Sequence, residues 1–163
     1  MKMMTAVGRY RQLQGERLAW AILSLFVLAL VLRAGFLLLV WGVDAPMDGD
    51  EPAYHGYAES FVEGNGWQNG DFKSGRSPLL PLQLAAIYSV TGPDPGLARW
   101  YMVAVSALGS PLVYLLARQI YPKLPLVAIL AGVGWAVYPP AIWYGSNILT
   151  ETMGAVLVAA SVA

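Results

Sequence analysis

Long apolar runs separated by short polar segments dominate the chain. The first run, 18–41, is interrupted only by Ser24, Gly35 and the charged Arg33. A helix over this run is long enough to cross a hydrocarbon core of about 30 Å. The run also exceeds the ~7–15 apolar residues of a cleavable signal peptide. The pattern therefore predicts a first transmembrane helix that is retained as an anchor.

Three later apolar runs predict further transmembrane helices, over 97–117, 124–144 and 148–163. The last run reaches Ala163 without a polar flank. We therefore expect 97–163 to hold transmembrane helices 2–4, with the fourth truncated. The expected fold class is all-α, a polytopic membrane bundle of about four transmembrane helices.

The longest polar region, 42–96, separates the first two predicted spans. We expect an extracytoplasmic loop with two interfacial helices, over 51–63 and 78–90, the second being too short to cross a bilayer comfortably. Pro52 suits the first turn of the earlier helix. Its apolar stripe at helical spacing consists of Tyr54, Tyr57, Ala58, Phe61 and Val62.

Basic residues indicate the orientation, because cytoplasmic loops carry an excess of Lys and Arg. With 97–117 as the second span, residues 1–17 are cytoplasmic. The inner side then holds Lys2, Arg9, Arg11, Arg17, Arg118 and Lys123, and the outer side holds Lys73, Arg76 and Arg99. A span over 78–90 instead would move two of the inner cations outside, so we prefer the first topology.

Composition excludes several classes of protein. Hydrophobic residues make up 57% of the chain and charged residues 12%, which argues against a disordered or nucleic-acid-binding protein. Ten basic and ten acidic residues balance each other, so we expect no nucleic acid among the partners. The absence of cysteine excludes a thiolate zinc site and a cysteine nucleophile.

Carboxylates from two separate loops are the candidate catalytic groups. Asp50 and Glu51 begin the predicted surface helix, and Glu151 lies in the first turns of the last predicted span, on the same outer side. An ionisable residue inside a span indicates a functional site by default. The alternatives left open are solvated cap residues for the first two and an interfacial acid for Glu151.

Other polar residues are weaker candidates for binding. Arg99 and Arg76 suit a lipid phosphate or, equally, headgroup anchoring. Tyr54 and His55 on the surface helix are further candidates, although His55 is more simply a polar-face residue. Asp48 and Asp50 have the spacing of oxygen ligands for a divalent cation such as Mg²⁺ or Mn²⁺.

Two remaining features are best explained by the membrane itself. Arg33 lies within the first span, where pairing with a neighbouring helix or snorkelling is more probable for an arginine than a ligand contact. The aromatic residues Trp41, Trp143 and Tyr144 lie near predicted membrane edges, as in an ordinary aromatic belt.

The order of these motifs resembles the N-terminal module of polytopic glycosyltransferases of the GT-C fold. The order especially resembles that in bacterial relatives of protein O-mannosyltransferases and lipid A aminoarabinose transferases. Asp50-Glu51 with Tyr54 and Ala58 is similar to the family's DE-x-x-Y-x-x-x-A segment, and Ser77 to Leu82 is similar to its P-L-Y-P segment, with Leu80 in place of Tyr. Short motifs similar to the family's also follow later in the chain, at Thr91-Gly92, Ala98-Arg99, Tyr138-Pro139 and Leu149-Thr150-Glu151.

The resemblance implies inverting transfer of a sugar from a polyprenyl phosphate carrier to an acceptor at the outer face. The acceptor is a lipid, a polysaccharide or a protein. Asp50 is then the base, Glu51 its assistant and Glu151 the acid of the second outer loop, with Arg99 taking up the phosphate charge. The implied location is a plasma (inner) membrane, multi-pass with a cytoplasmic N-terminus, and metal use varies among relatives.

Two other classes of function remain open. A non-catalytic membrane scaffold or assembly subunit would bind a carrier lipid or partner helices without turnover. A transporter would need polar residues along a path through the bilayer. Arg33 by itself is weak evidence for such a path.

Overall fold

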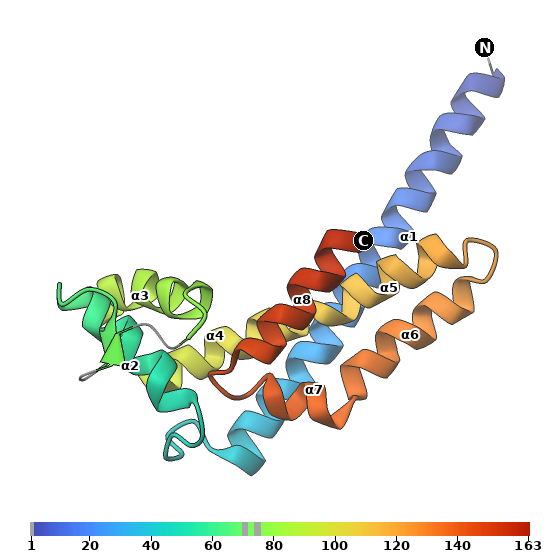
Figure 1. Ribbon diagram of the computed structural model, residues 1–163. Coiled ribbons are helices and arrows are strands. Elements are labelled where there is room, and N and C mark those ends of the chain that lie inside the picture. Colours follow the sequence, from blue (N-terminus) through green and yellow to red (C-terminus); the bar gives the residue numbers. More distant parts are fainter. Residues whose placement is uncertain (1, 70–71, 74–75) are drawn as a thin grey trace.

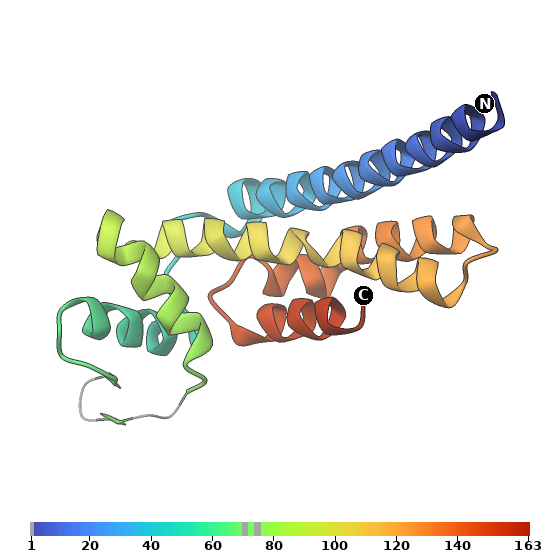
Figure 2. The same cartoon turned by 90° about the horizontal axis from the view of Figure 1, so that it is seen from above.

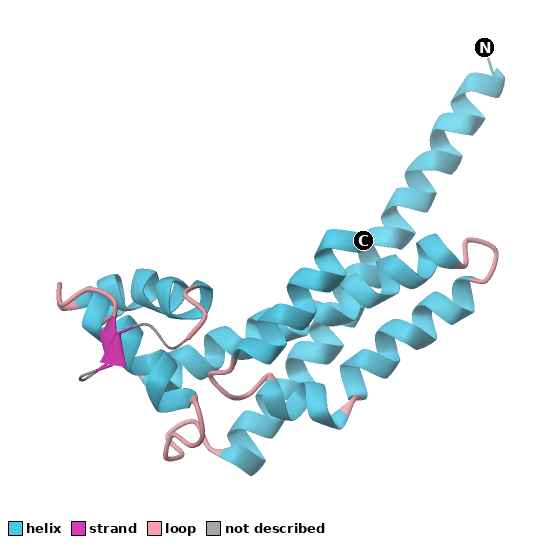
Figure 3. Ribbon diagram, in the orientation of Figure 1, coloured by secondary structure: helices cyan, strands magenta, loops and turns pink. Residues whose placement is uncertain are grey.

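The computed structural model describes residues 2–69, 72–73 and 76–163, and the side chains of residues 15–68 and 76–163. The described chain is almost entirely helical (Figure 3), which confirms the all-α prediction. Its single hairpin pairs β1 (Gln68–Asn69) with β2 (Phe72–Lys73) in antiparallel register. The side chains of Lys2, Arg9, Arg11 and Lys73, which entered the prediction of orientation, lie outside the described side chains.

The first helix is the longest. Helix α1 (Lys2–Phe36) continues into a π-helical turn, η1 (Leu37–Trp41), and ends at Gly42, whose φ of +95° suits a residue without a Cβ. Within it, Gly15–Trp41 is long and apolar enough to cross a membrane. The first predicted span therefore coincides with one of two such stretches in the described chain.

The second stretch is formed by two helices end to end. Helix α4 (Pro95–Ala107) begins where Asp94 Oδ1 accepts hydrogen bonds from two backbone N–H groups, and α5 (Gly109–Ile120) follows after a kink at Leu108. Pro111 explains the kink, because it offers no N–H to the carbonyl of Ala107. Together, Pro95–Ile120 is long and apolar enough to span.

The remaining helices are shorter than predicted. The expected helix over 124–144 is split into α6 (Pro125–Val137) and α7 (Pro139–Tyr144), because two consecutive prolines follow Tyr138. Helix α8 (Thr150–Val162) has 13 residues, as does α6. Neither is long enough to cross by itself, so the predicted four-span bundle is not confirmed, while two membrane-length stretches are found in the described chain.

The helices α1, α4, α5, α6 and α8 lie side by side as an elongated bundle (Figures 1 and 2). At the end of the bundle far from the N-terminus, α2 (Glu51–Val62) packs against α3 (Leu79–Thr91). These are the two helices predicted within the loop 42–96. A core between them, the start of α4 and the segment before α8 includes Tyr54, Leu84, Tyr88, Met102 and Ile148.

Large apolar side chains cover the outer surface of the bundle. On α1 and η1, Val31 is 61% exposed and Leu39 is 86% exposed, and Leu126 and Leu130 of α6 are similarly open. Such a surface is unfavourable in water and suits a hydrocarbon environment. The fold therefore supports membrane insertion of the long stretches, whereas multi-pass topology and N-terminal orientation stay predictions.

Candidate functional site

Glu51 is a buried structural anchor of the segment 42–96. It is 1% exposed, although it begins a helix. Its Oε1 accepts hydrogen bonds from Arg99 Nε (3.3 Å) and from the backbone N–H of Ile148 (2.9 Å). Its Oε2 accepts from Arg99 Nη2 (3.0 Å) and from the backbone N–H of Asp48 (3.2 Å). Glu51 thus joins the first loop, α4 and the segment before α8.

Arg99 has no N–H left for a ligand. An arginine carries five N–H donors. Besides the two bonds to Glu51, Arg99 donates to the carbonyls of Val43 (2.9 Å), Ala45 (2.7 Å) and Pro46 (3.5 Å), and its side chain is completely buried. The structure therefore gives Arg99 a scaffolding role in place of the predicted contact with phosphate. Glu51 is likewise too enclosed to meet an acceptor.

Asp50, the neighbour of Glu51, faces the other way. Its carboxylate is 42% exposed and forms an ion pair with Arg76, which is 38% exposed. The Arg76 guanidinium also lies 5.9 Å from the centre of the Tyr54 ring, a distance suited to a cation–π contact. One predicted carboxylate is therefore buried in the scaffold, and the other lies in the open beside a cation.

Asp50 and Glu151 line the same cavity, which we call the acidic cavity. Its volume is about 240 Å³. The lining residues are Trp41, Asp48, Gly49, Asp50, Trp143, Tyr144, Asn147, Leu149 and Glu151. The Glu51 bond to Ile148 explains the convergence, because it ties the segment before α8 to the loop that carries Asp50. The acids of the two loops thus come together in space.

The metal-binding role of Asp48 and Asp50 finds little geometric support. Both line the acidic cavity, and Asp48 Oδ1 accepts a hydrogen bond from the backbone N–H of Gly49 (2.7 Å). Within the described part of the chain, however, no group of three His, Cys, Asp or Glu residues is placed to hold a metal ion.

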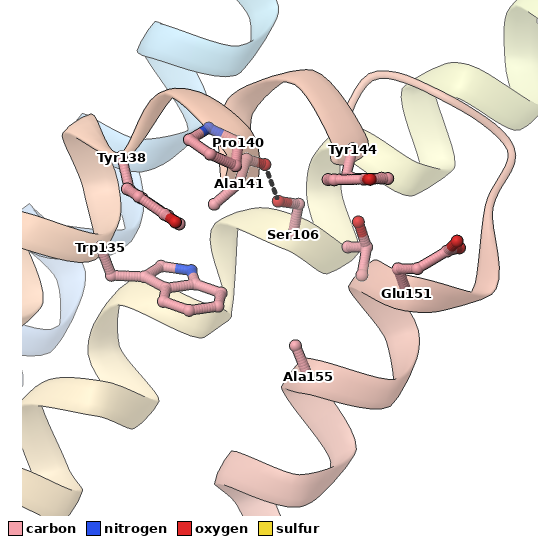
Figure 4. Close-up of a pocket in the computed structure, with 9 residues that line it drawn as sticks. Ser106, Trp135, Tyr138, Pro140, Ala141, Tyr144, Glu151 and Ala155 are labelled. Atoms are coloured by element: carbon pink, nitrogen blue, oxygen red, sulfur yellow. Dashed lines mark hydrogen bonds between the residues drawn. The ribbon is translucent and has the colours of Figure 1, made fainter.

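A second cavity, the apolar cavity, adjoins the first. It also has a volume of about 240 Å³ and lies between α4, the α6–α7 break and α8. The residues around it are Ser106, Trp135, Tyr138, Pro140, Ala141, Tyr144, Glu151, Thr152 and Ala155. Figure 4 shows the rings of Trp135 and Tyr138 at one end and Tyr144 with Glu151 at the other. Tyr144 and Glu151 line both cavities, so the two cavities adjoin at these residues.

Two polar atoms at the apolar cavity lack a hydrogen-bond partner. They are Thr152 Oγ1, on a side chain that is 6% exposed, and Trp135 Nε1. A third, Trp41 Nε1, belongs to a lining residue of the acidic cavity. Buried polar groups are normally paired, and exceptions call for an explanation. Trp135 Nε1 lies against the backbone of Gly109, where a Cβ would come within 2.2 Å of it.

The predicted binding residues Tyr54 and His55 line neither cavity. The Tyr54 hydroxyl hydrogen-bonds with Thr150 Oγ1 (3.0 Å), and His55 Nδ1 with the Tyr88 hydroxyl (2.9 Å). Burial lowers the pKa of His55 and raises that of Tyr88. Both groups are therefore neutral near pH 7, and they connect α2 to α3 rather than to a substrate.

The aromatic walls of the two cavities were missed by sequence reasoning. Trp41 and Trp143 meet edge to face, with ring centres 5.8 Å apart, and Trp143 packs in the same way against Tyr144 at 4.9 Å. They were interpreted as an aromatic belt. The available signal was the Pro139-Pro140 pair, which breaks the predicted helix just before the last two of these rings.

No protein-family model, curated protein or solved structure matches this chain. The functional interpretation therefore depends on the geometry of the two cavities together with the sequence motifs.

Proposed function

We propose that this chain forms part of a membrane glycosyltransferase that moves a sugar from a polyprenyl phosphate carrier to an acceptor at the outer face. The observation that carries the proposal is that the acidic cavity adjoins the apolar cavity at Tyr144 and Glu151, which line both. A lipid-linked sugar has a polar head and an apolar tail, and this pair of cavities offers a matching environment for each.

The acidic cavity suits the sugar and the acceptor. Asp50 takes the proton from an acceptor hydroxyl while that oxygen forms a bond to the anomeric carbon. The bond from that carbon to the phosphate oxygen breaks, its electron pair leaves with polyprenyl phosphate, and the configuration inverts. Glu151 is the second carboxylate in reach and holds sugar hydroxyls by accepting their hydrogen bonds.

Arg76, rather than Arg99, is the cation that we propose binds the leaving phosphate. Negative charge grows on the phosphate as it leaves, and a guanidinium binds phosphate oxygens through two parallel N–H groups. Arg76 is half-exposed and already beside Asp50, whereas the N–H groups of Arg99 are all occupied.

The test is carried out on the chain in lipid nanodiscs. Polyprenyl phosphate without sugar is the binding probe, and a panel of polyprenyl phosphate-linked sugars supplied with membrane lipid and cell-wall acceptors is the activity probe. Release of free polyprenyl phosphate reports turnover whichever acceptor is used. We expect carrier binding by the unaltered chain, and a loss of turnover by about a hundredfold or more in Asp50→Asn.

Glu63→Gln is the matched control, because Glu63 is an exposed acid at the opposite end of α2. It should leave both readouts unchanged. Turnover that survives in Asp50→Asn contradicts the assignment of the base. Carrier binding with no turnover of any donor instead favours a lipid-binding scaffold.

A further inference from the structure

The break between α6 and α7 leaves two backbone carbonyls without their helical partners. In an α-helix the carbonyl of residue i accepts from the N–H of residue i+4. For Trp135 and Ala136 those positions are Pro139 and Pro140, and proline has no N–H. The Trp135 carbonyl keeps only a long bond from the N–H of Tyr138 (3.4 Å). Without a substitute donor, the Ala136 carbonyl would be unpaired inside an apolar bundle, where that is most unfavourable.

Arg33 of α1 supplies the missing donors. Its Nη1 donates to the carbonyl of Ala136 (3.2 Å) and its Nη2 to that of Trp135 (3.4 Å). Nη1 also bonds the carbonyl of Ala29 (3.1 Å), and Nε donates to Ser106 Oγ (2.6 Å). The side chain is completely buried. The planar fork of a guanidinium reaches two neighbouring carbonyls at once, which a lysine ammonium does not do.

Ser106 extends this connection across the break. Its hydroxyl accepts from Arg33 and donates to the carbonyl of Ala141 in α7 (3.1 Å), as the dashed line in Figure 4 shows. Gly145 makes room for this contact, since a Cβ there would lie 2.3 Å from Ser106 Oγ. Arg33 is thus linked to the end of α6 directly and to α7 through a single hydroxyl.

Both cavities depend on the segment that is held in this way. Trp135 and Tyr138, at the end of α6, line the apolar cavity, and Trp143 and Tyr144 of α7 line the acidic one. We infer that Arg33 is a positioning residue that fixes the angle between α6 and α7 and thereby the shape of both cavities. This assignment holds for any ligand of the cavities, and only its binding test rests on the proposed function.

The test is a double-mutant cycle. Its two changes are Arg33→Met and the combined substitution of Pro139→Ala with Pro140→Ala. Amide hydrogen exchange of 141–147 is measured in nanodiscs, with α3 as the internal reference. We expect R33M to speed exchange of 141–147 at least tenfold while α3 changes less than twofold. The two alanines restore N–H partners for both carbonyls, so R33M should then change that exchange less than threefold.

A ligand readout separates positioning from mere stability. Positioning by Arg33 predicts that the cavity walls move when its side chain is removed, even where the chain stays folded. Measured well below its thermal midpoint, R33M should therefore bind polyprenyl phosphate at least tenfold more weakly than the unaltered chain. Arg33→Lys should give intermediate exchange, and it replaces R33M in the cycle if the methionine variant does not accumulate.

The inference is overturned by either of two results. One is an exchange effect of the Arg33 substitution that is equally large with and without the prolines. The other is undiminished carrier binding by R33M. If the unaltered chain binds no carrier, the proposed function fails, whereas the exchange cycle still tests the role of Arg33.

Discussion

The carboxylate of Glu51 and the guanidinium of Arg99 form a two-point ion pair out of contact with solvent, with Oε2 3.0 Å from Nη2 and Oε1 3.3 Å from Nε. The two residues are 48 positions apart in sequence. Their pairing joins the loop after η1 to α4 and thereby holds Asp50 at the mouth of the acidic cavity. The pair therefore acts on the site through the fold.

The first prediction concerns this ion pair. Glu51→Gln leaves the buried charge of Arg99 without its counter-ion, so the free energy of unfolding should fall by about 3–5 kcal/mol. Denaturant titration in micelles measures the change. Glu151→Gln is the matched control, because Glu151 is exposed, and it should change stability by less than about 0.5 kcal/mol.

A double substitution, Glu51→Met with Arg99→Met, completes that test. Replacing both charges by apolar groups removes the unpaired charge, so the double variant should be more stable than Glu51→Gln alone. Equal loss in the two variants would contradict the view that the ion pair, rather than packing, explains the sensitivity.

The second prediction concerns Arg76 and Asp50. Their ion pair is half-exposed, and such pairs contribute about 0–1 kcal/mol. Arg76→Gln should therefore leave the thermal midpoint nearly unchanged but slow the release of polyprenyl phosphate from a sugar-linked donor. Arg118→Gln, at the far end of α5, is the matched control. Unchanged turnover in Arg76→Gln would remove Arg76 from the proposed mechanism.

The third prediction concerns the orphan hydroxyl of Thr152. Valine has almost the same shape and no group to desolvate, so Thr152→Val should raise the stability of the ligand-free protein, by at most about 1–3 kcal/mol. A higher thermal midpoint is expected, and a lower midpoint would show that Thr152 has a partner within the protein.

The fourth prediction is a dependence on pH. The folded protein lowers the pKa of His55 from its ordinary value of 6.5, chiefly by burial. In the window just below pH 6.5 the unfolded chain therefore binds more protons than the folded one, and stability falls as pH falls. The free energy of unfolding falls by at most about 1.4 kcal/mol per pH unit. It stops falling once the pH is below the pKa of His55 in the folded protein.

Thermal unfolding between pH 7.5 and 5.5 measures this slope. His55→Gln keeps a polar group near Tyr88 but does not titrate, so it should flatten the curve over that range. A curve of the same slope in His55→Gln would assign the pH dependence to another group.

The sequence by itself determined where the first three helices lie. Apolar runs, the stripe over 51–63 and the prolines and glycines at helix ends are local signals, and α1, α2 and α3 begin and end within a few residues of their predicted positions, apart from the N-terminal extension of α1. It also indicated that Asp50 and Glu151 would share one side of the protein, because the order of helices restricts which loops can meet.

Only the tertiary structure decided what neighbouring residues do. Asp50 and Glu51 carry the same local signal, an acid at a helix start, yet one lines a cavity and the other is enclosed. The partners of Glu51 lie 48 and 97 positions away, and no local pattern records such distances. Arg33 is the same case, since its role depends on carbonyls that two distant prolines deprive of their usual helical donors. Burial and hydrogen bonding are properties of the packed chain, and they separate the scaffold from the site.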